Sequence, residues 1–129
     1  IENTERPQLF IGSGVGMTPL VSMFKKAASL NVPTQMIQAV VTEDERPFAQ
    51  KLDSITANHE QAQLHLHVKD KEGYLEAKEL EQYLSEQPEI YICGGTKFLH
   101  SIINSLKELN YDMNHVHFET FIPRLSVQV

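Results

Sequence analysis

A glycine-rich loop, Gly12–Pro19 (GSGVGMTP), holds the residues best suited to chemistry and directly follows a short apolar run. Glycines adopt backbone geometries closed to other residues and let a ligand approach the main chain closely. Thr18 suits the capping position of a following helix, and Pro19 suits its first residue. The free N–H groups and positive dipole end of that helix would face the loop, which predicts a seat for a pyrophosphate. The residues predicted to bind it are Gly12, Gly14, Val15, Gly16, Met17, Thr18 and Pro19.

The spacing of this loop departs from two familiar phosphate-binding motifs. Met17 occupies the third glycine position of the dinucleotide fingerprint G-x-G-x-x-G. The loop also lacks the Gly-Lys-Ser/Thr ending of a P-loop, which argues against ATP or GTP hydrolysis. The alternative is a strand-to-helix turn that binds nothing, and the Thr-Pro pair that opens the helix favours the ligand-binding interpretation.

The elements that must position this loop follow from alternating apolar runs and amphipathic stretches. Strands are predicted at 9–11, 36–41, 64–68, 90–93 and 115–118, and helices at 20–30, from 47, at 75–84 and at 98–106. Such alternation predicts an α/β three-layer sandwich, a five-stranded parallel sheet of order 3-2-1-4-5 with helices on both faces. Ligands of such sheets bind where the strand order reverses, between strands one and four.

Size and composition favour a single domain of a soluble protein. The chain has 129 residues, 41% of them hydrophobic, and a net charge of −6, which disfavours nucleic-acid and anionic-membrane partners. No apolar run approaches the roughly 18 residues that cross a bilayer. A single cysteine, Cys93, suits a reducing cytoplasm. The chain begins with Ile1, and we expect residues 1–129 to be one domain of a longer polypeptide.

Four segments together resemble the NAD(P)H-binding domain of the ferredoxin–NADP reductase superfamily, above all that of flavohemoglobins, the nitric oxide dioxygenases. They are the glycine loop, Gly73-Tyr74-Leu75, the block 90–99 (IYICGGTKFL) and the closing segment 117–121 (HFETF). Two positions depart from the family pattern. Gly95 stands where a proline is usual, which should loosen the turn after Cys93, and Ile122 stands where a glycine is usual.

The resemblance implies hydride transfer from NAD(P)H to an FAD, which passes electrons to haem for the dioxygenation of nitric oxide to nitrate. Cys93 would be a catalytic neighbour of the nicotinamide, where its small thiol leaves room for the ring, and Glu119 would reach the flavin. A nucleophilic role for Cys93 is poorly supported, because no basic partner is identifiable. FAD and haem would belong to other domains of the same polypeptide, so residues 1–129 should not turn over alone. The further residues that the resemblance places near the cofactors are Gly94, Gly95, Thr120, Phe121, Ile122 and Pro123.

The acidic stretch after the second strand bears on the choice of nucleotide. Glu43 in this stretch could accept a hydrogen bond from a free ribose hydroxyl and would repel a 2′-phosphate, which favours NADH over NADPH. Arg46, Lys69 and Lys71 lie close enough in the sequence to oppose that preference.

Two histidine pairs have a spacing compatible with metal binding, 65/67 on the third strand and 115/117 on the fifth. Those strands should lie at opposite edges of the sheet, so we expect no metal site and interpret the pairs as solvated or packed histidines. Two alternatives to the flavohemoglobin reading remain open. One is another reductase of the superfamily with an iron–sulfur or other acceptor, and the other is a nucleotide-binding module without catalysis.

Overall fold

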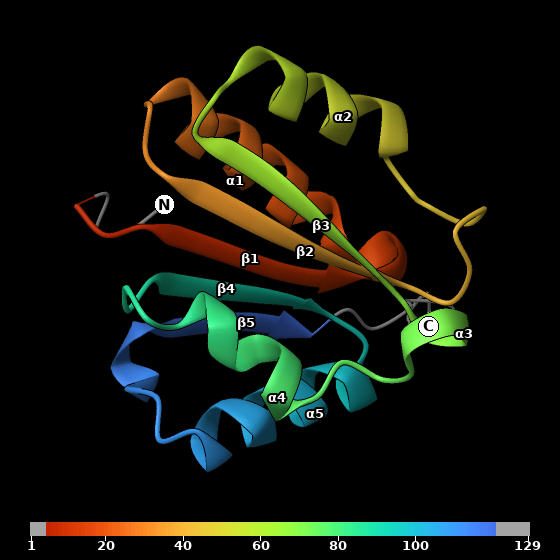
Figure 1. The fold of residues 1–129 in the computed structure, drawn as a ribbon, viewed down its shortest axis with the longest axis vertical. Coiled ribbons are helices and arrows are strands. Elements are labelled where there is room, and N and C mark those ends of the chain that lie inside the picture. The colour runs from red at the N-terminus through yellow and green to blue at the C-terminus, as the bar shows by residue number, and fades with distance from the viewer. Residues whose placement is uncertain (1–4, 121–129) are drawn as a thin grey trace, which may run out of the picture.

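The computed structural model describes residues 5–120, except for the side chains of residues 15, 16 and 120, and is built on one five-stranded sheet (Figure 1). All neighbouring strands are parallel and their order is β3-β2-β1-β4-β5, which confirms the predicted topology. The strands are β1 Gln8–Ser13, β2 Thr34–Val40, β3 Ala62–Val68, β4 Glu89–Gly94 and β5 Val116–Thr120.

Helices cover both faces of the sheet, as predicted. In Figure 1, α1 and α2 lie on one side of the strands and α4 and α5 on the other. Among the described residues, no helix combines the length and apolar content that a bilayer crossing needs. The α-helices are α1 Thr18–Ser29, α2 Ala49–Asn58, α3 Lys69–Glu72, α4 Ala77–Leu80 and α5 Thr96–Glu108, and 3-10 turns span Gly14–Met17, Glu81–Tyr83 and Met113–His115.

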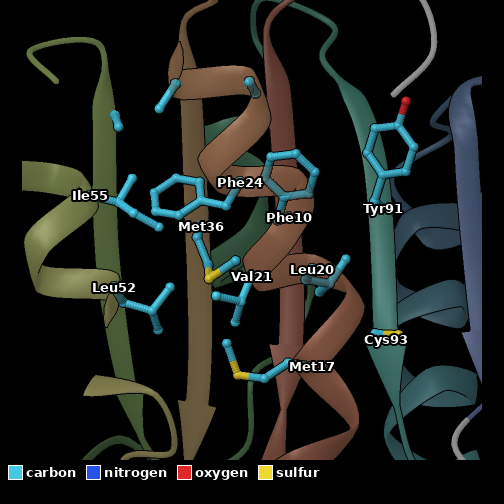
Figure 2. Close-up of a cluster of buried hydrophobic side chains, with 13 residues drawn as sticks. Phe10, Met17, Leu20, Val21, Phe24, Met36, Leu52, Ile55, Tyr91 and Cys93 are labelled. Carbon is cyan, nitrogen blue, oxygen red and sulfur yellow. The ribbon is translucent and has the colours of Figure 1, made fainter. Parts of the chain in front are cut away.

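Two apolar clusters fill the spaces between the sheet and its helices, because β1 is buried on both faces. Phe10 points to the α1 side and packs against Phe24 and Tyr91 (Figure 2). Ile11, the next residue, belongs to the second cluster, where it meets residues such as Ile102 of α5. Each fully buried side chain of this size stabilises the fold by about 1.5–3 kcal/mol.

The four predicted helices correspond to α1, α2, α4 and α5, but their bounds differ from the prediction. The stretch 75–84 is not one helix, since α4 ends at Leu80 and a 3-10 turn follows. The second helix begins at Ala49 rather than at Pro47, because Phe48 adopts a left-handed φ of 61° that no α-helix tolerates. The four-residue helix α3 was not predicted, since one turn is too short to produce an apolar period.

Candidate functional site

The glycine loop leaves the end of β1 and turns directly into α1. Gly14 begins the 3-10 turn with φ of +59°, a conformation that side-chain-bearing residues rarely adopt. Gly12 serves a different purpose, because a Cβ there would lie 2.8 Å from the Met17 Cβ and 2.9 Å from Leu20 Cδ1. One glycine therefore permits the turn, and the other permits the turn to pack closely on the strand.

Helix α1 begins one residue earlier than predicted. Met17, rather than Thr18, is the N-cap, and its side chain makes no capping hydrogen bond. The tight turn before the helix places Thr18 and Pro19 already within the first helical turn. Met17 is fully buried in the cluster on the α1 side (Figure 2), so of this residue only the backbone can reach a ligand. The positive end of α1 therefore faces the carboxyl edge of the sheet, where it can stabilise an anion.

Strand register brings three of the predicted residues into one row. Gly12 on β1 pairs with Cys93 on β4, and Cys93 pairs with Glu119 on β5. The backbones of Gly94 and Thr120 form the next step of the same register. The carboxyl ends of β1 and β4 thus lie side by side at the point where the strand order reverses, as the sequence predicted.

Cys93 occupies a closed environment at the end of β4. Its side chain belongs to the cluster on the α1 side, and the residue is only 3% exposed. Burial raises the pKa of the Cys93 thiol, and the Glu119 carboxylate raises it further, against an opposing hydrogen bond from the Gly94 backbone. A thiol with a raised pKa stays protonated, whereas the nucleophilic form of cysteine is the thiolate. This agrees with the expectation that Cys93 is not a nucleophile.

A cleft of about 690 Å³ opens beside the glycine loop, at the carboxyl ends of β1, β2 and β3. It lies on the α5 side of the sheet, since Ser13 and Ile11 are two residues apart on β1 and share a face, and Ile11 packs on that side. Two lysines and one glutamate contribute charge to its wall. The lining residues are Ser13, Gly14, Ala39, Val40, Val41, Glu45, Pro47, His67, Lys69, Gly73, Tyr74, Leu75, Lys97, Phe98 and Ser101.

The cleft includes an aromatic residue that sequence reasoning did not place in the site. Tyr74 is 69% exposed, and the Nζ of Lys69 lies 4.6 Å from the centroid of its ring. An exposed aromatic face beside a cleft can stack against a nucleotide base. The signal in the sequence is the Gly73-Tyr74 pair, which follows the third predicted strand.

The acidic stretch after β2 divides between two environments. Glu43 forms an ion pair with Lys71 and does not line the cleft. Glu45 does line the cleft, and its carboxylate accepts a hydrogen bond of 3.1 Å from Thr42 Oγ1. Arg46 is directed away into a pair with Asp53 at 2.9 Å. Of the acidic residues in this stretch, Glu45 is therefore the one that lines the cleft.

The remaining predicted residues lie at or beyond the carboxyl end of β4 and β5. Gly95 is the N-cap of α5 with φ of −70°, a value that a proline also adopts. Phe121, Ile122 and Pro123 lie outside the described residues. Their roles near a flavin therefore stay predictions.

The two histidine pairs lie at opposite edges of the sheet, on β3 and near β5, as predicted. His65 Nε2 lies 2.7 Å from Gln35 Oε1. His115 and His117 both contact the buried Glu89, at 3.0 and 2.6 Å. Within residues 5–120, no group of three or more histidine, cysteine or acidic side chains has the arrangement to hold a metal ion. The histidines are thus packed against hydrogen-bonding partners.

Comparison with known proteins gives consistent matches. The family model described as "Oxidoreductase NAD-binding domain" matches residues 10–103. The flavohemoprotein of Oceanobacillus iheyensis is 27% identical over 95% of the chain, and the glycine betaine monooxygenase reductase subunit of Chromohalobacter salexigens is 28% identical over 88%. The chain spans 33% and 34% of their lengths. The solved FAD/NAD-binding domain of nitric oxide dioxygenase from Vibrio cholerae has a TM-score of 0.83 and 25% identity, with 95% of this chain and 54% of that one covered.

Proposed function

This chain belongs to the oxidoreductase NAD-binding domain family, and on that premise we propose that it presents NAD(P)H for hydride transfer to FAD. The flavin would be held by a flavin-binding domain of the same polypeptide. One observation carries this proposal, namely the positive end of α1 beside a cleft of about 690 Å³ at the strand-order reversal. That combination suits a ligand with a central pyrophosphate and a large organic half.

The geometry supports one orientation of the dinucleotide. The backbone N–H groups of residues 14–18 would bind the pyrophosphate, and the adenosine half would enter the cleft and stack against Tyr74. The nicotinamide would then extend over the row formed by Gly12, Cys93 and Glu119. We propose that the small thiol of Cys93 would leave room for the ring at the end of β4. When bound, the nicotinamide supplies the hydride, and the protein supplies position and polarity.

We propose haem as the final electron acceptor, with nitric oxide dioxygenation as the activity of the whole polypeptide. The support is the relatedness to a flavohemoprotein and to the Vibrio cholerae domain. A reductase with another acceptor is the alternative, and the glycine betaine monooxygenase reductase subunit favours it. A nucleotide-binding module without catalysis is the third reading. The reading frame upstream of Ile1 distinguishes the three proposals. A flavin-binding barrel encoded there supports a reductase, and a globin domain before that barrel supports nitric oxide dioxygenation.

Calorimetric titration with ADP-ribose tests the binding proposal directly. This fragment carries the adenosine and the pyrophosphate but no nicotinamide, so the contacts proposed for it all lie on this chain. We expect one site per chain and an affinity at least about tenfold higher than that for adenosine, because only ADP-ribose engages the end of α1. Equal affinities would contradict the pyrophosphate seat, and failure of ADP-ribose to bind would overturn the proposed function.

We further propose that NADH is preferred over NADPH, and we assign the preference to Glu45. Replacing Glu45 by Gln should raise NADPH affinity relative to NADH by about fivefold, since it removes a negative charge that faces a 2′-phosphate. Replacing Lys69 by Gln should have the opposite effect. Glu43→Gln serves as the control, because Glu43 pairs with Lys71 outside the cleft lining. Dissociation constants at low salt provide the measurement, and tighter NADPH binding by the unchanged chain would contradict the preference.

A further inference from the structure

A buried histidine holds the turn that leads from β3 into the wall of the cleft. His67 is only 7% exposed and lies on the cleft side of β3. After it the chain passes through α3 to Gly73, whose φ is +77°, and then to the exposed Tyr74. A buried polar side chain in this position costs free energy unless it is hydrogen-bonded, so its partners indicate its purpose.

The partners of His67 are groups of the turn itself. Its Nε2 lies 2.9 Å from the carbonyl oxygen of Gly73. A carbonyl only accepts hydrogen bonds, so Nε2 carries the hydrogen and donates it. The other ring nitrogen, Nδ1, lies 3.9 Å from Oε1 of Glu72, while Oε2 of the same carboxylate accepts the N–H of Val68 at 2.9 Å. The imidazole thus joins the end of β3 to the residue that precedes Tyr74.

Backbone contacts fix the remainder of the turn. The N–H of Gly73 donates to the carbonyl of Lys69 at 2.8 Å, and the N–H of Asp70 donates to the carbonyl of Val41 at 3.0 Å. The turn is therefore attached to the ends of both β2 and β3. Tyr74 is the next residue, and its exposed ring contacts Lys69 on the same turn. The direction in which Gly73 leaves the turn decides where that ring stands.

We propose that His67 is a positioning residue that fixes Gly73 so that Tyr74 stands at the edge of the cleft, ready to stack against the adenine. This inference rests on the proposed function of dinucleotide binding. An exposed aromatic that is ordered before binding loses less conformational entropy when the base arrives, and the affinity rises accordingly. His67 acts through Tyr74, and the pyrophosphate seat on the other side of the cleft is independent of it.

The test is a double-mutant cycle of His67→Ala and Tyr74→Leu, with calorimetric affinities for ADP-ribose and for inorganic pyrophosphate. We expect His67→Ala to weaken ADP-ribose binding about fivefold and to leave pyrophosphate binding unchanged. In the Tyr74→Leu background, the same substitution should have no further effect. His67→Gln should restore most of the affinity, because its amide nitrogen can take the place of Nε2. Should His67→Ala fail to fold, His67→Asn replaces it, since that shorter amide does not reach Gly73.

The outcomes separate this inference from the proposed function. Failure of the unchanged chain to bind ADP-ribose overturns the proposed function and the role of His67 with it. Normal ADP-ribose affinity in His67→Ala overturns the role of His67 alone. Three other outcomes would also overturn it, because each indicates general structural damage instead of positioning through Tyr74. They are a loss of pyrophosphate affinity in His67→Ala equal to its loss of ADP-ribose affinity, additive effects of the two substitutions, and no rescue by His67→Gln.

Discussion

Replacing Gly12 by Ala is expected to weaken ADP-ribose binding about tenfold, which corresponds to about 1.4 kcal/mol of binding free energy. The new Cβ would lie 2.8 Å from the Met17 Cβ and 2.9 Å from Leu20 Cδ1. The Leu20 side chain can rotate its methyl group away from the new Cβ. The Met17 Cβ cannot, because it moves only when the backbone of Met17 moves. The turn 14–17 must therefore shift, and it shifts the N–H groups proposed to bind the pyrophosphate.

The same substitution should lower the free energy of unfolding by about 2 kcal/mol, as overpacking of a buried contact does. Gly95→Ala is the matched control for stability, because Gly95 has φ of −70° and nothing within 4 Å of the Cβ position. Its free energy of unfolding should change by less than about 0.5 kcal/mol. Urea unfolding and calorimetry measure both effects. Unchanged ADP-ribose affinity in Gly12→Ala would contradict the proposed seat.

Replacing Glu89 by Ala is expected to lower the free energy of unfolding by about 3 kcal/mol. Glu89 opens β4, is only 3% exposed, and receives hydrogen bonds from His115 at 3.0 Å and His117 at 2.6 Å. Arg6 Nε lies 3.5 Å from the same carboxylate. The His117 ring also stacks on Tyr91 with centroids 4.8 Å apart. Loss of the carboxylate leaves these donors without a common acceptor and removes a side-chain link between β4 and β5.

The contribution of Glu89 to the free energy of unfolding should decrease as the pH falls. Burial alone raises the pKa of Glu89, but hydrogen bonds from His117 and His115, together with their charges, outweigh burial and lower it. A carboxyl whose folded pKa is depressed stabilises the fold above its unfolded value, here 4.5, and loses that contribution as the pH falls through the folded pKa.

Chemical unfolding of Glu89→Gln and of the unchanged chain between pH 7 and pH 3 checks this expectation. The amide does not titrate, so the difference in unfolding free energy should shrink as the pH falls below 4.5. Glu60→Ala, which removes an exposed carboxylate, is the control and should change stability by less than about 0.5 kcal/mol. A difference that grows on acidification would refute the depressed pKa.

The sequence alone predicted the fold and the strand-order reversal at which we propose the site. Apolar periodicity and turn residues are local properties, so they predicted the five parallel strands, their order and the reversal between β1 and β4. The same reasoning placed Gly12, Cys93 and Glu119 at strand ends, which the register then aligned. Element bounds were less accurate. The N-cap was assigned to Thr18 because its hydroxyl favours that position, whereas the preceding 3-10 turn decides where α1 begins.

Only the tertiary structure decided which side chains meet. Glu89 lies 26 and 28 positions from the histidines it contacts, and no local pattern connects residues so far apart. Glu45 and Glu43 are equivalent in the sequence, yet one lines the cleft and the other pairs with Lys71. No pattern in the sequence connects His67 with the carbonyl oxygen of Gly73, which lies 2.9 Å from its Nε2. Such partners depend on how strands and turns pack in space, and that packing is set by the whole chain rather than by neighbouring residues.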